Sequence, residues 1–231
     1  MVRPKGTAVL PQTTTDVVYA HVFFQRRIVM NGLAFNEDLR DGFQEIANVA
    51  VGQTADRLAR SFSTFVRMPI PHVHLLESAD IRMALGGVAD VENVTAVTQA
   101  FFGDGVSGEA LLLISDSSSD ELARLMGYAP PTTEQEQLEH ILEISSLLTA
   151  SCIQSVLDQL EIDVLINHPT LLGRHTRVRD LFLDQDLPWD KTLAVELNYT
   201  FEGFGLCCDL ILLFHQEALP ALFSKLELLL G

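Results

Sequence analysis

Polar and apolar residues separate onto opposite sides of a predicted helix that includes residues 41–58. At about 100° per residue, its polar positions fall within about 60° of one another. They are Asp41, Glu45 and Asn48, with Gly52 one turn further on. The predicted buried face consists of Phe43, Ile46, Ala47, Ala50 and Leu58. By itself, such a polar stripe is typical of the solvated face of an amphipathic helix.

The same pattern recurs about one hundred residues further along the chain. Three polar residues again share one face of a predicted helix, and each lies 98 positions after its counterpart. They are Glu139, Glu143 and Ser146. Pro169 also lies 98 positions after Pro71. A repeat of this kind indicates two copies of one supersecondary unit, which must pack together to bury their apolar faces.

Two β-rich runs separated by a glycine-containing turn follow each helix. The runs are 94–102 and 106–114 in the first half, and 193–201 and 206–214 in the second. The turns contain Gly103 and Gly105, then Gly203 and Gly205, which can supply the positive φ angles of a tight turn. A short helix is predicted after each hairpin, at 120–126 and 217–226.

These elements predict an α/β (α+β) fold that forms a single pseudo-twofold domain. One hairpin alone is marginally stable in water, so the halves are expected to share one antiparallel sheet packed against two long motif helices. The two repeats cover about 34–128 and 134–231, and residues 128–133 join them. Residues 1–33 do not match the repeat and are assigned to an N-terminal extension.

Composition narrows the classes of partner. The 231 residues carry 31 acidic and 15 basic side chains, for a formal charge of −16. Nucleic-acid binding depends on many Lys and Arg side chains, so charge argues against DNA, RNA and anionic membranes as partners. No apolar run approaches the roughly 20 residues of a membrane-spanning helix. We therefore expect a cytoplasmic protein with an ample apolar core.

The cysteines and histidines do not suggest a metal site. Cys152, Cys207 and Cys208 have no CxxC spacing, which favours reduced thiols over a zinc site. His72 and His74 could share one side of a strand, but no nearby Cys or third His completes a ligand set.

The full spacing of the motif changes the interpretation of the polar stripe. Asp41-x3-Glu45-x2-Asn48-x22-Pro71 resembles the signature of the CheC, CheX and FliY chemotaxis phosphatases. The second copy has the same spacing, as Glu139-x3-Glu143-x2-Ser146-x22-Pro169. Two copies in one chain resemble the CheC type, and the resemblance extends from about residue 35 to the C-terminus.

The resemblance implies hydrolysis of the aspartyl phosphate of a phosphorylated CheY-like receiver domain. Asn48 would orient the attacking water, and Glu45 would pair with the receiver's active-site lysine. Asp41 and Pro71 would have supporting roles. The Mg²⁺ ion belongs to the receiver, so no cofactor is expected in this chain.

The second copy departs from the family pattern, because Ser146 replaces the asparagine and Glu139 replaces the usual Asp or Ser. Serine is shorter, so we expect a degenerate second site in which Glu143 can at most dock a receiver. An alternative hypothesis is a non-catalytic adaptor that binds receivers, a CheD-type protein or a flagellar switch partner. A third is that both polar stripes serve only for solvation.

Overall fold

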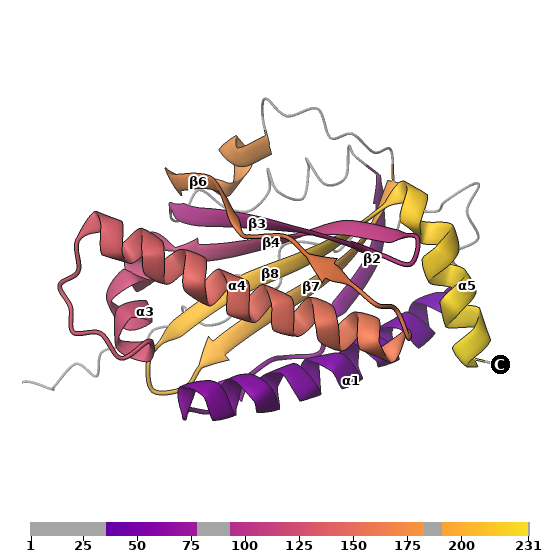
Figure 1. Ribbon diagram of the computed structural model, residues 1–231, viewed down its shortest axis with the longest axis horizontal. Helices are drawn as coiled ribbons and strands as arrows, with labels where there is room; N and C mark the ends of the chain where they lie inside the picture. Colours follow the sequence, from indigo (N-terminus) through magenta and orange to yellow (C-terminus); the bar gives the residue numbers. More distant parts are fainter. Residues whose placement is uncertain (1–35, 78–92, 183–190, 231) are drawn as a thin grey trace, which may run out of the picture.

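The computed structural model describes residues 36–77, 93–182 and 191–230 (Figure 1). The predicted N-terminal extension, residues 1–33, lies outside the described residues. Two long helices carry the two motif copies, α1 (Glu37–Phe62) and α4 (Glu134–Gln159). Each begins at a polar capping residue: the Asn36 side chain accepts a hydrogen bond from the Leu39 amide at 2.8 Å, and Thr133 forms a capping box with Glu136.

Eight strands in the described part of the chain form one antiparallel sheet. They are β1 (Val66–Arg67), β2 (His72–Glu77), β3 (Val94–Gly103), β4 (Val106–Ser115), β5 (Leu165–Ile166), β6 (Thr170–Thr176), β7 (Lys191–Phe201) and β8 (Leu206–His215). The main path runs β1-β7-β8-β4-β3-β5, with β2 also paired to β7 and β6 also paired to β3.

The strand order joins the two halves of the chain. The two hairpins, β3–β4 and β7–β8, meet at the centre of the sheet through the β4–β8 pair, where Leu111 lies opposite Ile211. The outer strands of each half pair with the hairpin of the other half, β1 and β2 with β7, and β5 and β6 with β3. Neither half could therefore keep its complete sheet without the other.

The remaining helical elements are shorter than α1 and α4. They are η1 (Asp116–Ser118), α3 (Ser119–Leu125), η2 (Val178–Phe182), η3 (Gln216–Ala218) and α5 (Leu219–Leu230). Figure 1 shows α1 and α4 across one face of the sheet, with α3 and α5 at opposite ends. α5 packs against α1, where Leu230 lies beside Gly42, and α3 packs against α4. The four helices and the antiparallel sheet confirm the predicted α+β fold.

The main core lies between the sheet and the two long helices. Phe43 of α1 and Phe101 of β3 both make edge-on contacts with Phe214 of β8, at ring-centroid distances of 5.8 and 5.4 Å. The predicted buried face of α1 is confirmed, with Phe43, Ala47, Ala50 and Leu58 fully buried and Ile46 partly buried. A second, smaller cluster that includes Leu111 and Leu213 covers the opposite face of the sheet.

The first hairpin turn differs from the prediction in one detail. Gly105 has the expected positive φ, 79°, and Gly203 and Gly205 in the second turn also have positive φ angles, 85° and 67°. Gly103 is required for another reason, because a Cβ there would lie 1.9 Å from the carbonyl oxygen of Asp163. Close approach of the chain after α4, and not a left-handed backbone, explains this glycine.

The expectation that no apolar run approaches the length of a membrane-spanning helix needs one qualification, which concerns α4. Among the described residues it is the one helix that is long and apolar enough to cross a membrane, and 61% of its most apolar stretch is buried. It packs on α1, β3 and β4. This burial is that of a core helix.

Candidate functional site

The polar stripe of α1 lies on the solvent side of the helix. Asp41, Glu45 and Asn48 are all exposed, opposite the buried face that holds the helix on the sheet. Gly52 continues the stripe, and a Cβ at this position would meet no described atom within 4 Å. The surface around Asn48 is therefore open enough for the backbone of another protein to approach.

Glu45 and Asn48 have no structural role in the part of the chain that the structure describes. Among the described residues, neither side chain forms a hydrogen bond or an ion pair, whereas neighbouring polar groups do. Asp41, for example, accepts hydrogen bonds from the Arg40 guanidinium at 2.9 and 3.1 Å. A carboxylate and a carboxamide one turn apart are thus held by a rigid, packed helix and remain available to a partner.

Pro71 lies next to the same helix. It is buried immediately before β2, and its carbonyl oxygen accepts a hydrogen bond from the side-chain amide of Gln44. Gln44 immediately precedes Glu45, so the fourth position of the motif contacts the helix that carries the first three. Sequence reasoning did not single out Gln44, because a polar residue at a half-buried helix position has no distinctive signal.

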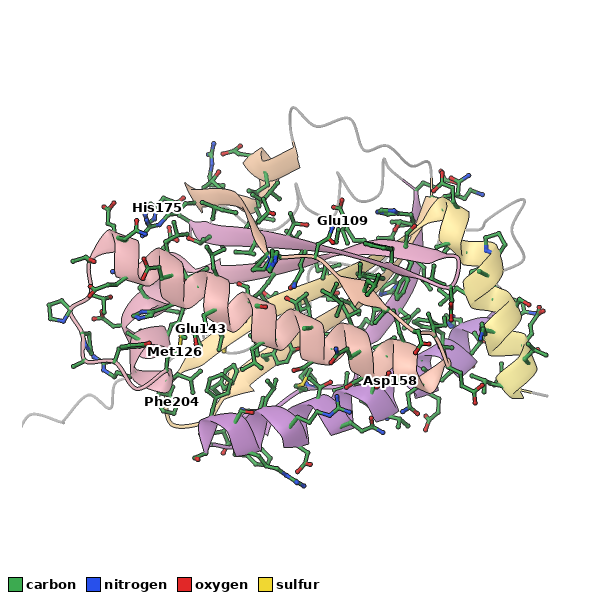
Figure 2. The ribbon with its side chains drawn as sticks, viewed as in Figure 1. Glu109, Met126, Glu143, Asp158, His175 and Phe204 are labelled. Atoms are coloured by element: carbon green, nitrogen blue, oxygen red, sulfur yellow. The ribbon has the colours of Figure 1, made fainter. Side chains whose placement is uncertain are left out.

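The second polar stripe has a similar position on α4 but a different composition. Glu139 and Glu143 are exposed, and Glu139 accepts a hydrogen bond from the Gln135 side chain at 2.9 Å. Figure 2 shows Glu143 on the half of α4 nearest α3, with Asp158 close to the other end. Ser146, the counterpart of Asn48, is only half-exposed, and Pro169 is half-buried.

A buried carboxyl group, Glu196, and a half-buried one, Asp209, on the other face of the sheet escaped the sequence analysis. Burial, and then the nearby charge of Asp209, raise the pKa of Glu196 to about 7. Burial also raises the pKa of Asp209, opposed by the Asn198 amide that donates to its carboxylate at 2.6 Å. The sequence signal that could have revealed them was an acidic residue in the middle of a strand that is otherwise mostly apolar.

The histidine pair borders this polar cluster. His72 lies opposite Glu196 on the neighbouring strand, and the His72 and His74 rings stack at a centroid distance of 6.3 Å. Burial, followed by the charges of His72 and Arg40, lowers the pKa of His74 to about 4. No group of three or more His, Cys, Asp or Glu side chains in the described ranges could hold a metal ion.

All three cysteines are free. Cys152 and Cys208 are buried and Cys207 is half-buried, which agrees with the prediction of reduced, mostly buried thiols. Burial raises the pKa of Cys152 to about 12, so its thiol is inert as a nucleophile.

Comparison with known proteins gives a structural match without a sequence match. No protein-family model matches the chain, and no curated protein sequence does. FliY from Thermotoga maritima superposes with a TM-score of 0.62 at 16% identity, covering 84% of this chain and 98% of that one. The FliM middle domain from H. pylori superposes with a TM-score of 0.55 at 12% identity, covering 82% and 99% of the respective chains.

A further match is a chain of the FliG–FliM complex from H. pylori, with a TM-score of 0.53 at 10% identity and coverage of 82% and 99%. Identities this low establish the fold and leave the activity open. The resemblance noted in the sequence is thus confirmed at the level of the fold, and the chain has the architecture shared by FliY and the FliM middle domain.

Proposed function

We propose that the chain is a cytoplasmic CheC-like phosphatase that hydrolyses the aspartyl phosphate of a CheY-like receiver domain in a chemotaxis pathway. The observation that supports this most strongly is the geometry of α1. Glu45 and Asn48 lie one turn apart, exposed, and without a partner among the described residues. Their spacing to Asp41 and Pro71 is that of the phosphatase signature.

The chemistry suits a carboxamide. Hydrolysis of an acyl phosphate requires a water in line with the breaking P–O bond, and most of the rate enhancement comes from positioning and charge stabilisation. The Asn48 side-chain oxygen accepts a hydrogen bond from that water while its NH₂ group donates another. The proton and the phosphate leave with solvent, and the receiver aspartate is regenerated.

Glu45 has a docking role in this proposal. Its carboxylate pairs with the receiver's active-site lysine, which fixes the distance between Asn48 and the phosphoryl group. Asp41 is held by Arg40 near the start of the helix, and Pro71 supports the helix from β2. The Mg²⁺ ion is supplied by the receiver, and this chain contributes no metal or other cofactor.

The copy on α4 is inactive in this proposal. A serine hydroxyl ends closer to the helix than a carboxamide, and Ser146 is already half-covered by its surroundings. Glu143 remains exposed and can still contact a receiver. One chain therefore has one hydrolytic site, centred on Asn48.

The first test measures the decay of a phosphorylated CheY-type receiver with and without the chain. We expect the chain to accelerate decay, Asn48→Ala to reduce the acceleration by about 100-fold or more, and Ser146→Ala to leave it within twofold. Both side chains are outside the core, so both variants should fold. Equal losses from the two substitutions would contradict the assignment of the active site.

A non-catalytic adaptor remains the second candidate. The FliM middle domain shares this fold, and one structure of it is a complex with FliG. An adaptor would bind a receiver, a CheD-type protein or a flagellar switch component without changing the decay rate. Binding of the beryllofluoride-activated receiver together with unchanged decay of the phosphorylated form would support this alternative.

A further inference from the structure

We propose that Gln44 is a positioning residue for the candidate site, an inference that rests on the proposed function. Its side-chain amide donates a hydrogen bond to the Pro71 carbonyl, and we call this contact the Gln44–Pro71 bridge. The bridge sets the rotation of α1 relative to the sheet, and thereby the direction in which Glu45 and Asn48 project. Gln44 itself does not contact the receiver's phosphoryl group.

The sheet side of the bridge is a fixed point. Pro71 is buried, and β2, which begins at the next residue, pairs with β7 from His72 to Glu77. β7 in turn pairs along its length with β8, near the centre of the sheet. A hydrogen bond to the Pro71 carbonyl therefore ties α1 to the most extensively paired part of the fold.

The helix side of the bridge lies where orientation matters most. Gln44 is the residue before Glu45 and four before Asn48, whereas a second hydrogen bond from α1 to a packed element lies further along the helix. There the Thr54 hydroxyl is 3.4 Å from the Ser151 carbonyl oxygen of α4, a long hydrogen bond. The buried face between them includes Ala47, Ala50 and Val51, which pack in the core but supply no hydrogen bond that would fix a direction.

A small rotation would be costly. At the outer radius of a helix, about 5–6 Å, a rotation of about 10° displaces a side-chain group by about 1 Å. Displacement of that size can reduce the rate of a positioned reaction by about 100-fold. One directional hydrogen bond next to Glu45 is therefore enough to separate a competent site from a misaligned one.

The inactive copy has no such bridge. The residue that corresponds to Gln44 is Leu142, a partly buried apolar side chain that cannot donate to Pro169. α4 is tied to β6 at a different place, where the Arg174 guanidinium donates to the Gln137 side chain at 3.2 Å. The second copy therefore differs from the first in the support of its helix as well as in Ser146.

The test compares Gln44→Met with the wild-type chain in steady-state dephosphorylation of the receiver that the wild type dephosphorylates. Methionine keeps the length and helix propensity of glutamine but cannot donate a hydrogen bond. We expect kcat to fall about tenfold while KM stays within twofold, because misorientation affects the reacting geometry more than docking. The melting temperature should change by a few degrees at most, since methionine packs well at a half-buried position.

Leu142→Gln is the matched control at the corresponding position of α4, and it should leave kcat within twofold. A Gln44→Met variant with wild-type kcat, or one changed only in KM, would overturn the positioning role. Equal effects of the two substitutions would do so as well, because they would indicate a general loss of stability.

The outcome separates this inference from the proposed function. If Asn48→Ala abolishes the acceleration and Gln44→Met does not reduce kcat, the phosphatase proposal stands and the positioning role fails. If the wild-type chain accelerates the decay of no phosphorylated receiver, both fail together.

Discussion

At the residue scale, the feature that distinguishes Glu45 and Asn48 is the lack of any task within the described fold. Most polar side chains near them cap a helix, pair with a neighbour or tie one element to another, as Asn36, Asp41 and Gln44 do. The exposed pair was predictable from the helical period of the sequence. The chemistry proposed for them rests on the motif alone, because solvation and catalysis place polar residues on the same side of a helix.

Glu196 gives a prediction about pH and stability. Burial raises its pKa to about 7 in the folded chain, so between its ordinary pKa and pH 7 the folded state binds more protons than the unfolded state. Stability therefore falls as pH rises through this window. Glu196→Gln should melt close to the wild type at pH 4 and above it at pH 8, and thermal melts over this range measure the difference.

Asp209 should behave in the same direction, because its pKa is also raised by burial. Asp116, the first residue of η1 just after β4, provides a contrast, since its carboxylate accepts a hydrogen bond from the Thr95 hydroxyl at 3.0 Å and lies 2.8 Å from the His175 ring nitrogen. Asp116→Asn should therefore not reproduce the high-pH gain. A Glu196→Gln variant whose advantage is the same at all pH values would contradict the assignment of a buried, protonated carboxyl group.

At the scale of elements, α1 has one face packed on the sheet and an opposite face exposed to solvent. The boundaries of the hairpins were predictable to within two residues, because their apolar runs end at glycines. The close approach that requires Gly103 was not predictable, since the contact is with Asp163, sixty residues away in the sequence. The Gln44–Pro71 bridge was unpredictable for the same reason. It joins a side chain of α1 to a backbone carbonyl 27 residues later, and the sequence does not show that the two groups meet.

Gly52 and Gly103 should respond in opposite ways to substitution by alanine. Gly52 lies in the exposed interior of α1 with open space around it, so Gly52→Ala should raise the free energy of unfolding by about 1 kcal/mol. Gly103→Ala forces a Cβ toward the Asp163 carbonyl and should lower it by about 2 kcal/mol or more. Chemical denaturation of both variants measures these changes.

The same Gly52→Ala variant also probes docking. If the receiver approaches α1 at the open surface beside Asn48, the added methyl group should weaken binding of the beryllofluoride-activated receiver despite the more stable helix. Ala150 is already the counterpart on α4, and Ala150→Gly should destabilise the chain without affecting that binding. Unchanged binding by Gly52→Ala would place the docking surface elsewhere on the chain.

At the scale of the whole molecule, both halves of the chain build one sheet, and the two motif helices share the core beside it. Each half supplies outer strands to the other half's hairpin, so one copy can lose its chemistry while its helix is still needed for the core. The repeat in the sequence predicted one shared sheet but not which strands would pair. Pairing depends on contacts between distant residues, such as Val66 with Phe201, that leave no local pattern.

The central claim is that the carboxamide at position 48 makes one of the two copies hydrolytic. The most direct measurement is the decay rate of the phosphorylated receiver at saturating concentrations of an Asn48→Ser variant, which gives α1 the residue found on α4. The account predicts that the variant binds the beryllofluoride-activated receiver within about threefold of wild-type affinity and loses about 100-fold or more of its acceleration. An Asn48→Ser variant that dephosphorylates the receiver at the wild-type rate would contradict it.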